Sequence, residues 1–362
     1  MTPPRAPQDG AFMRRALVLA RRGWGQTAPN PMVGAVVVRG GQTVGEGWHA
    51  EFGGPHAEVL ALAAAGDAAK GADVYVTLEP CAHHGKTPPC ALALIAAGVR
   101  RVVIAHPDPS PVAKGGAAAL HAAGIEVVEG VERDRAADLN APFLFQHAVS
   151  DRPFVTLKLA LSSEGALARA DGRQIWLTGT SARRQVHRWR AGADAIAVGV
   201  GTAIADDPAL TVRHGHRPRI APKRVVFDRT ARLPPTGKLV ETARRVPTWV
   251  IAERPDPARA AALEAAGVVV HRAAGLGAQL ALLRAEGVGH LFVEGGAGLA
   301  DALLGAGWVD RLIIFRAPVP LGAGALAGLG TAVPPVEGTE RWQVLERRTY
   351  GDDQMTRYRA VR

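Results

Sequence analysis

The order of apolar and polar positions predicts a set of strands and helices in the first half of the chain. Residues 10–22 carry apolar side chains at helical spacing, and the uninterrupted apolar run 32–38 is typical of a buried strand. A turn then leads into a second strand at 43–49, so the two strands form a hairpin. The predicted segments that follow are a helix from 56, a strand at 73–78, a helix from 90, a strand at 101–105, a helix at 116–123 and a strand at 125–128. An opening hairpin followed by alternating strands and helices predicts an α/β/α sandwich with a mixed sheet.

The same kind of pattern restarts after residues 150–153. The predicted strands are 154–161, 195–198, 224–228, 248–252, 268–271, 291–293 and 312–315, and the predicted helices are 181–190, 257–266, 276–286 and 298–305. The polar tail 342–362 is also strand-like. Because 362 residues exceed what one hydrophobic core usually serves, we expect two domains, residues 1–148 and 149–362.

Charge and composition narrow the classes of partner. The formal net charge is +10, but the basic residues are dispersed, mostly Arg, and form no run of five. This distribution favours solvated faces and binding sites for small anions over a nucleic-acid surface. No stretch approaches 18 consecutive apolar residues, which argues against a membrane span. The first residues lack the apolar centre of a signal peptide, so cytoplasmic residence is the expectation.

Both cysteines of the chain, Cys81 and Cys90, lie in one short stretch downstream of His56 and Glu58. One imidazole and two thiolates fill three corners of a zinc tetrahedron and leave the fourth for water. A Glu beside the ligating His can move protons to and from that water. This order of residues is the one that zinc-dependent deaminases of bases and nucleosides use. Two prolines before Cys90 predict a helix start, whose amide dipoles would help to keep the Cys90 thiol deprotonated.

Other interpretations of these residues remain. The two cysteines could form a disulfide, although nothing in the sequence indicates an oxidising compartment. A structural zinc site would need a fourth ligand, for which His83 and His84 are the nearest candidates. The presence of all the pieces together favours a catalytic zinc site.

The second half holds no cysteine, so its chemistry has to be sought in other features. Two glycine-rich turns follow predicted strands, at 199–202 and at 295–298, and the second opens a helix whose amides suit a pyrophosphate. Neither matches the full dinucleotide fingerprint, and the segment 275–277 is interpreted as a turn. The two segments therefore fit equally well with a binding site for a nucleotide cofactor and with two turns that have only a structural role.

Several segments resemble one family, the bifunctional riboflavin-biosynthesis deaminase–reductases, from end to end. They are 29–36 (PNPMVGAV), 54–58 (GPHAE), 77–81 (TLEPC), 88–90 (PPC), 176–178 (WLT), 199–202 (GVGT), 205–213 (ADDPALTVR) and 293–296 (VEGG). The resemblance implies a cytidine-deaminase-like first domain and a dihydrofolate-reductase-like second domain. It also implies two successive steps on a pyrimidine that carries a ribose 5-phosphate. The ring 2-amino group is replaced by oxygen with release of ammonia, and NADPH then reduces the ribosyl group to ribityl.

The resemblance assigns roles in the first domain. His56, Cys81 and Cys90 match the ligands of one Zn²⁺, and Glu58 matches the proton shuttle. The positions that match a lining for the pyrimidine and its phosphate are Asn30, His49, His83, Lys86, Asp108 and Ser110, where Ser110 replaces a common Asn.

It assigns roles in the second domain as well. NADPH-binding positions are Ala160, Trp176, Thr202, Asp206, Gly296, Ala297, Gly298, Leu299, Ala300, Asp301 and Ala302. Substrate-binding positions are Lys158, Gln174, Arg190, Leu210, Arg213 and Glu294. Arg229 stands where the family commonly has a small hydroxyl residue, and its guanidinium could bind the 2′-phosphate of NADPH or lie in solvent. The stretch 162–166 reads SSEGA where the family usually has SLDGK, which is a departure in a loop of the reductase.

Two rival functions stay open at this point. A deaminase of a base in tRNA, or of another nucleobase, would explain the basic charge but would leave the second half as an accessory nucleotide-binding domain. A zinc-stabilised RNA-binding protein would need a fourth protein ligand and a clustered basic surface. We expect a phosphoribosylated pyrimidine as the substrate, no membrane or nucleic-acid partner, and a homo-oligomer.

Overall fold

The computed structural model describes residues 8–83, 88–149, 151–169, 176–215, 217–327 and 339–361. The chain divides into two compact units, residues 1–149 and 150–362, and each is described by itself. Within the described residues, no helix is both long and apolar enough to cross a membrane.

The first unit is built around a five-stranded mixed sheet in the order β2-β1-β3-β4-β5. β1 pairs antiparallel with β2 and with β3, while β3, β4 and β5 run parallel. The strands are β1 Gly34–Arg39, β2 Gln42–Trp48, β3 Asp73–Val76, β4 Arg101–Ile104 and β5 Glu126–Glu129. The helices are α1 Asp9–Ala20, α2 Ala57–Ala65, α3 Cys90–Ala96, α4 Gly116–Ala122, α5 Arg133–Leu139 and α6 Ala141–Ala148.

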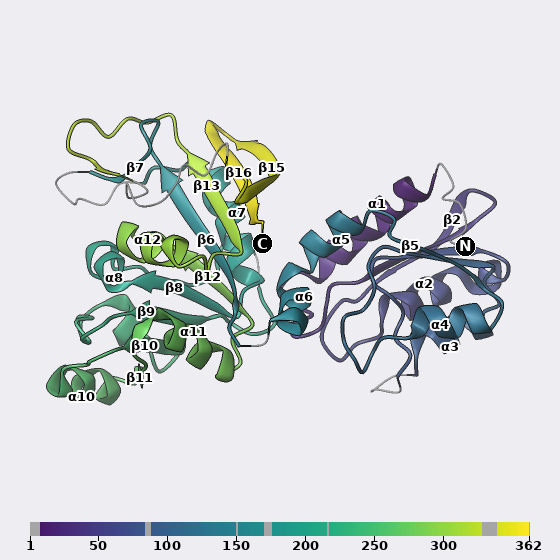
Figure 1. The fold of residues 1–362 in the computed structure, drawn as a ribbon, viewed down its shortest axis with the longest axis horizontal. Helices are drawn as coiled ribbons and strands as arrows, with labels where there is room; N and C mark the ends of the chain where they lie inside the picture. The colour runs from purple at the N-terminus through teal and green to yellow at the C-terminus, as the bar shows by residue number, and fades with distance from the viewer. Residues whose placement is uncertain are drawn as a thin grey trace. The chain divides into compact units, whose positions relative to one another are not determined.

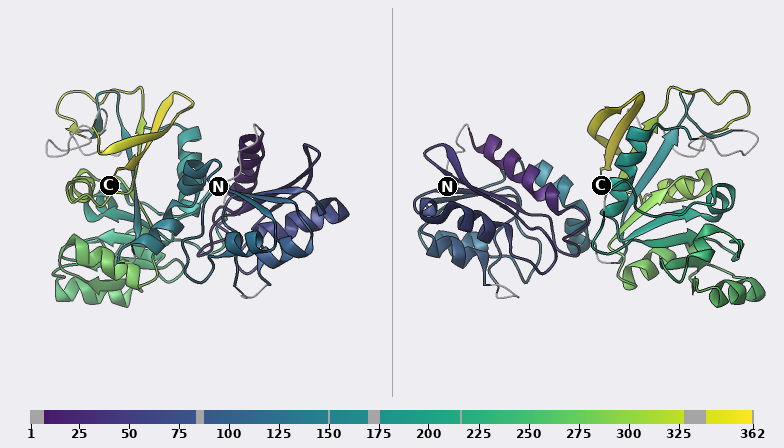
Figure 2. Two further views of the ribbon diagram at one scale, coloured as in Figure 1. Left: turned by 45° about the vertical axis from the view of Figure 1, so that its right-hand side comes forward. Right: turned by 180° about the vertical axis from the view of Figure 1, so that it is seen from behind.

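Helices cover both faces of this sheet (Figures 1 and 2). Alternate residues of β1 serve the two faces, because successive side chains of a strand point to opposite sides. Ala35 and Val37 pack with residues of α2, α3 and α4, whereas Val36 and Val38 pack with residues of α1 and α5. The expected α/β/α sandwich with a mixed sheet is confirmed. Helices α5 and α6 were not predicted.

The second unit has a nine-stranded sheet in the order β11-β10-β9-β8-β12-β6-β13-β16-β15. All neighbouring strands from β11 to β13 are parallel, and the C-terminal hairpin β15–β16 adds antiparallel strands at one edge. The strands are β6 Phe154–Leu161, β8 Ala195–Gly199, β9 Lys223–Phe227, β10 Thr248–Ala252, β11 Val269–Arg272, β12 His290–Glu294, β13 Arg311–Arg316, β15 Trp342–Tyr350 and β16 Asp353–Ala360. A separate small ribbon pairs β7 Ala166–Ala168 with β14 Leu326–Ala327.

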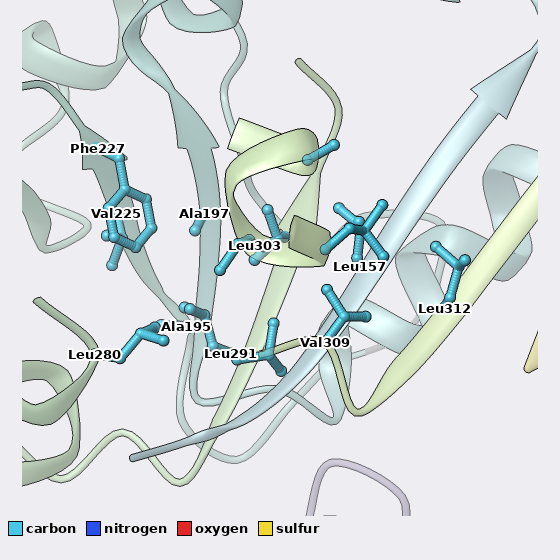
Figure 3. Packing of buried hydrophobic residues seen from close by; sticks show 14 of the residues in the cluster. Leu157, Ala195, Ala197, Val225, Phe227, Leu280, Leu291, Leu303, Val309 and Leu312 are labelled. Carbon is cyan, nitrogen blue, oxygen red and sulfur yellow. The ribbon is translucent and has the colours of Figure 1, made fainter. Parts of the chain in front are cut away.

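The helices of the second unit are α7 Thr180–Ala191, α8 Val200–Asp206, α9 Lys238–Glu241, α10 Pro257–Ala265, α11 Gly275–Ala285 and α12 Ala297–Gly305. One core cluster joins alternate residues of the central strands to α11 and α12, and Figure 3 shows Leu157, Ala195 and Leu291 from three strands meeting Leu280 and Leu303 from these helices. The other face packs against α7, α8, α9 and α10.

Two local expectations about glycines are corrected. The segment 275–277, interpreted as a turn, forms the first turn of α11, and the expected turn 199–202 continues at once into α8. Glycine lowers helix propensity, but the apolar side chains that follow bury against the sheet and override it. The polar tail, expected to be strand-like, forms the hairpin of β15 and β16.

Candidate active sites

Three side chains from three element boundaries meet in the first unit. His56 is the residue before α2, Cys81 follows β3, and Cys90 is the first residue of α3. Nδ1 of His56 lies 3.1 Å from Sγ of Cys90 and 3.6 Å from Sγ of Cys81, and the three potential ligand atoms all lie within 4.8 Å of one another. Soft sulfur and imidazole donors grouped at this distance fit a zinc ion.

Close packing of α2 on β2 fixes the position of His56. A Cβ atom on Gly47 would lie 2.3 Å from the carbonyl oxygen of Ala57 and 2.5 Å from the amide nitrogen of Ala61. Only glycine permits this approach, because any side chain at that point would push the helix away. The position of the first turn of α2, and of the metal ligand before it, therefore depends on a residue in the neighbouring strand.

Glu58 lies in the first turn of α2, two residues after His56, and is 4% exposed. Burial raises the pKa of Glu58 to about 7, because the carboxylate loses its hydration. A carboxyl group that titrates near neutral pH can both accept and return a proton. Glu58 lies beside the three candidate ligands without belonging to their cluster, and this position suits the expected role of a proton carrier.

The two thiols respond differently to their surroundings. Cys81 accepts a hydrogen bond from the backbone amide of Cys90 at 3.4 Å. Hydrogen bonds from Cys90 and from His56 lower the pKa of Cys81 to about 4. The hydrogen bond to Cys81, together with burial, raises the pKa of Cys90. A cation between the two sulfur atoms would favour the thiolate form of both cysteines.

A cavity of about 340 Å³ opens onto this cluster. Its size suits a small ligand. It brings together most of the residues that the sequence assigned to the deaminase site, namely Asn30, His49, His56, Glu58, Cys81, His83, Asp108 and Ser110. Lys86, which was assigned to the same site, lies outside the described residues, as does His84.

Two of the lining residues fix one another's orientation. Nδ1 of His49 lies 3.0 Å from the carbonyl oxygen of Pro55, so this nitrogen carries the proton and donates it. Nε2 of His49 is then an acceptor for the amide of Asn30 at 3.3 Å. Burial lowers the pKa of His49, which keeps the ring neutral and preserves this arrangement.

Glu79 is a residue beside the pocket to which we assigned no role from the sequence. It is 9% exposed and follows β3 by three residues. Its carboxylate accepts hydrogen bonds from the amides of Asp108, Gly115 and Ala117 at 3.0–3.1 Å. It thereby holds the loop that carries Asp108 and Ser110 against the pocket. Its place next to Pro80 and Cys81 was the only signal in the sequence.

Phe52 and Phe143 also line the pocket and were not predicted. Nδ1 of His83 is buried and has no hydrogen-bond partner within the described parts of the chain. A buried polar atom of this kind at the wall of a cavity fits contact with a bound polar ligand. The cluster of potential metal ligands includes neither His83 nor any fourth group among the described residues, which favours an open metal site over a structural one.

The second unit gathers charged side chains where its parallel strands end. Lys158 of β6 and Glu294 of β12 are register partners in neighbouring strands. Arg190 of α7 pairs with both carboxylate oxygens of Glu294 and donates to the carbonyl oxygen of Thr211 at 2.9 Å. Arg190 lowers the pKa of Glu294 against the effect of its burial, whereas burial lowers the pKa of Lys158. Carboxyl ends of parallel strands are where open α/β sheets bind ligands.

The loop after α8 joins this group. The backbone amide of Arg213 donates to Nδ1 of His187 at 3.1 Å, and His187 lies on the same helix as Arg190. The side chain of Leu210 is 3% exposed and packs in the core, with a positive φ of 45°. The side chain of Leu210 is therefore not available to a ligand, and the expected substrate contact would have to be made by its backbone. Gln174 lies outside the described residues.

The two glycine-rich segments lie next to each other. Gly296 directly precedes α12 with φ 79°, and a Cβ atom there would come within 2.7 Å of Oγ1 of Thr202 in α8. The amide of Gly295 donates to the carbonyl oxygen of Lys158 at 3.3 Å. The absence of side chains at Gly295 and Gly296 leaves room beside the first backbone amides of α12, and such a helix start suits a phosphate group. Among the other expected cofactor residues of α12, Leu299 and Ala300 contribute their side chains to the core.

The remaining expected cofactor residues vary in exposure. Trp176 is 66% exposed and carries the guanidinium of Arg183 over its ring at 5.3 Å. Burial raises the pKa of Asp206. Ala160 is partly buried beside β13. Arg229 follows β9 and is 72% exposed, with its Nε 3.6 Å from a carboxylate oxygen of Glu253.

Known proteins match both units. The family model of the cytidine and deoxycytidylate deaminase zinc-binding region matches residues 6–106, and that of the RibD C-terminal domain matches residues 153–355. The riboflavin biosynthesis protein RibD of Haemophilus influenzae is 41% identical over 360 residues, which cover 96% of each chain. The chain belongs to the RibD family.

Solved structures of RibD proteins agree with this assignment. The Acinetobacter baumannii RibD structure has a TM-score of 0.83 at 40% identity, covering 98% of this chain and 99% of that one. A Thermotoga maritima protein, described as a diaminohydroxyphosphoribosylaminopyrimidine deaminase/5-amino-6-(5-phosphoribosylamino)uracil reductase, has the same TM-score and coverage at 32% identity. The expected cytidine-deaminase-like first domain and dihydrofolate-reductase-like second domain are confirmed, and the chain is a bifunctional RibD with a deaminase and a reductase domain. A nucleobase deaminase with an accessory domain is not favoured.

Proposed function

We propose that this RibD protein deaminates 2,5-diamino-6-(5-phosphoribosylamino)pyrimidin-4-one at a zinc site and then reduces the ribosyl group of the product with NADPH. The observation that carries the first step is the cluster of His56, Cys81 and Cys90 with buried Glu58 beside it, at the wall of a pocket of suitable size. The second step is supported by the charged group formed by Glu294 at the carboxyl end of β12, Lys158 beside it on β6 and Arg190 of α7, and by the glycine turn before α12.

In the deaminase site, His56, Cys81 and Cys90 would hold the zinc ion. A bound Zn²⁺ supplies a Lewis acid that makes water a nucleophile at neutral pH. Glu58 then moves protons: its carboxylate takes one from the attacking water and returns it to the departing amino group, which leaves as ammonia. Burial of Glu58 excludes bulk water from this transfer.

Recognition of the pyrimidine falls to neutral polar groups. The His49–Pro55 hydrogen bond orients the amide of Asn30, so that its oxygen remains an acceptor for a ring N–H or amino group. Glu79 holds the loop of Asp108 and Ser110, which also line the pocket, through the backbone amide of Asp108. Lys86 would meet the phosphate from the loop between the two cysteines.

In the reductase site, NADPH would bind along α8 and α12, with phosphate oxygens at the amides of the glycine turn. NADPH supplies the hydride, and the protein orients the two reactants. Arg190 and Arg213 are suited to the substrate phosphate, because a guanidinium can donate two parallel hydrogen bonds. Lys158 and Glu294 would position the ribosyl group. Arg229 would contact the 2′-phosphate after leaving Glu253.

A coupled assay on the full-length protein tests both steps. Ammonia release and NADPH oxidation are followed separately with the diaminopyrimidinone ribosyl phosphate as the substrate. We expect ammonia without NADPH, and NADPH oxidation only after deamination. Ammonia release from adenosine in tRNA, with none from this pyrimidine, would refute the proposal.

We further propose that residues 1–148 form an autonomous deaminase domain, residues 149–362 a reductase domain, and the whole chain a homo-oligomer. A fragment 1–148 should bind zinc and deaminate, since its site residues all precede the boundary. A folded, zinc-loaded but inactive fragment would show that the reductase domain supplies part of the deaminase site. Light scattering of the full chain measures the oligomer.

A further inference from the structure

The deaminase pocket extends beyond the region that the zinc-deaminase family model matches. That model ends at residue 106, yet Asp108, Ser110, Ala113 and Phe143 also line the cavity. Phe143 is the most distant of these in sequence and lies on α6, a helix that the sequence did not predict. An element outside the shared zinc-deaminase region is where selectivity for a particular ring can be added.

A buried asparagine fixes α6 to the pocket. Asn140, the residue before α6, is 3% exposed. Its side chain accepts a hydrogen bond from the amide of Met32 at 2.9 Å and donates one to the carbonyl oxygen of the same residue at 2.8 Å. Met32 follows Asn30 by two residues. The helix carrying Phe143 is therefore tied to the loop that carries a polar group of the pocket.

The ring of Phe143 is supported from its own helix. His147, one turn further along α6, packs edge-on against it with ring centroids 4.8 Å apart and an interplanar angle of 67°. An edge-on neighbour restricts rotation of the phenyl ring while leaving a face free. The cavity lining includes a second aromatic residue, Phe52.

We propose that Phe143 is a substrate-positioning residue of the deaminase, which covers one face of the pyrimidine ring and is held in register with Asn30 by Asn140. The inference rests on the proposed deamination and adds a residue that selects a planar heteroaromatic ring. Stacking of a phenyl ring on a base is a strong and orientation-dependent contact. An aliphatic side chain at this position cannot stack, so the pyrimidine ring loses the contact. Stacking on Phe143 sets the plane of the pyrimidine ring, and hydrogen bonds from Asn30 then set its orientation within that plane.

The test uses the zinc-loaded full-length protein and two ligands. The first is the diaminopyrimidinone ribosyl phosphate, and the second is free 2,5,6-triaminopyrimidin-4-one, used as a competitive inhibitor that has the ring but no ribosyl arm. For Phe143→Leu we expect KM for the substrate and the inhibition constant of the free ring both to rise about tenfold. We expect kcat to change less than threefold and zinc content and NADPH oxidation to stay unchanged.

Three further variants separate contact from folding. Phe143→Tyr keeps the aromatic face and should leave both constants within threefold. Phe145→Leu is the matched control, since Phe145 lies on the same helix and is not part of the pocket lining. Asn140→Asp keeps the acceptor for the amide of Met32 but loses the donor to its carbonyl oxygen. We expect it to weaken the binding of both ligands, but by less than Phe143→Leu does. If Phe143→Leu loses zinc, Phe143→Met replaces it as the non-aromatic variant of similar volume.

Each outcome decides the inference. It is overturned if Phe143→Leu binds the free ring as well as the unaltered protein does, whether or not KM for the full substrate rises. It is overturned equally if Phe143→Tyr is as weak as the leucine variant with zinc retained. Absence of ammonia release from the substrate by the unaltered protein would instead refute the proposed function.

Discussion

The two units place their candidate sites at comparable points of the fold but assemble them differently. In the first unit, the metal-ligand candidates and Glu58 lie between His56 and Cys90, and a single pocket contains most of the predicted residues. In the second, the charged group spans the chain from Lys158 to Glu294 and comes together only through the parallel register of β6 and β12. A metal site demands particular residue types at short spacing, whereas a hydride site leaves the chemistry to its cofactor.

The two units also differ in net charge. Residues 1–149 contain 13 basic and 13 acidic residues, while residues 150–362 contain 30 and 20, so the second unit accounts for the whole net charge of +10. Such a positive field raises the local concentration of anions, which would favour the proposed binding of a dinucleotide phosphate and a ribosyl phosphate by the second unit. In the first unit, a bound cation would provide the charge where the reaction needs it.

The largest expected effect is confined to the first unit. Glu58→Gln should lower deamination by about 10²–10⁴-fold, which is the usual contribution of general acid–base catalysis. Zinc content and NADPH oxidation on deaminated substrate should be unaffected, because Glu58 is not a ligand. The measurement is ammonia release together with zinc stoichiometry. Loss of zinc would show that Glu58 supports the metal site, and the comparison of independent sites would need revision.

The corresponding substitution in the second unit should lower NADPH oxidation and leave deamination unchanged. Glu294→Gln removes the largely buried negative charge that neutralises Arg190, while the hydrogen bond from Arg190 to the carbonyl oxygen of Thr211 remains. Loss of the charged partner of such a pair typically costs about 2–5 kcal/mol. We expect NADPH oxidation to fall about thirtyfold or more, since 1.4 kcal/mol corresponds to one decade, with ammonia release unchanged. Glu241→Gln, at an exposed glutamate of the same unit, is the control. A lower melting temperature with unaltered kinetics would make Glu294 a structural residue.

Sequence patterns anticipated most strands and helices because long apolar runs must be buried. They missed α5 and α6, which are seven and eight residues long and follow one another with no strand between them, so they break the alternation of strands and helices on which the prediction rested. In the deaminase site, residue chemistry identified His56, Glu58, Cys81 and Cys90, whereas Phe143 enters only through the position of α6. In the reductase site, the burial of Leu210 and the contact of His187 with Arg213 depend on tertiary packing that no local pattern encodes.

A smaller effect concerns the choice of cofactor. Arg229→Ala should weaken NADPH use by about tenfold and hardly change NADH use, because a guanidinium contributes roughly 1.5–3 kcal/mol per hydrogen bond to a charged group. In the structure, Arg229 is exposed and lies near Glu253, so it has to exchange that weak ion pair for the phosphate. KM values for both cofactors are the measurement. Equal losses for the two would indicate a role in folding or substrate binding, and no loss would leave Arg229 in solvent.

The smallest effect is a difference in acid sensitivity that originates at His187. Its Nδ1 accepts the amide of Arg213, which requires an unprotonated nitrogen. Burial, together with the nearby Arg190 and Arg213, lowers the pKa of His187 from 6.5 to about 4. The unfolded chain therefore binds a proton between these two values while the folded chain does not. Stability is retained above pH 6.5 and falls as the pH drops from 6.5 toward 4, by at most about 1.4 kcal/mol per pH unit.

A glutamine in place of His187 tests whether stability falls with decreasing pH as predicted. His187→Gln can present an amide oxygen to Arg213 and does not titrate, so its stability should lack this acid-dependent loss. Between pH 6.5 and 5.0 the unaltered protein should lose up to about 2 kcal/mol more than the variant, measured by urea unfolding of the second unit's transition. The first unit's transition should show no difference between the two proteins. Parallel stability curves for the second unit would mean that His187 takes up a proton in the folded state, and that the loop of Arg213 is held by other contacts.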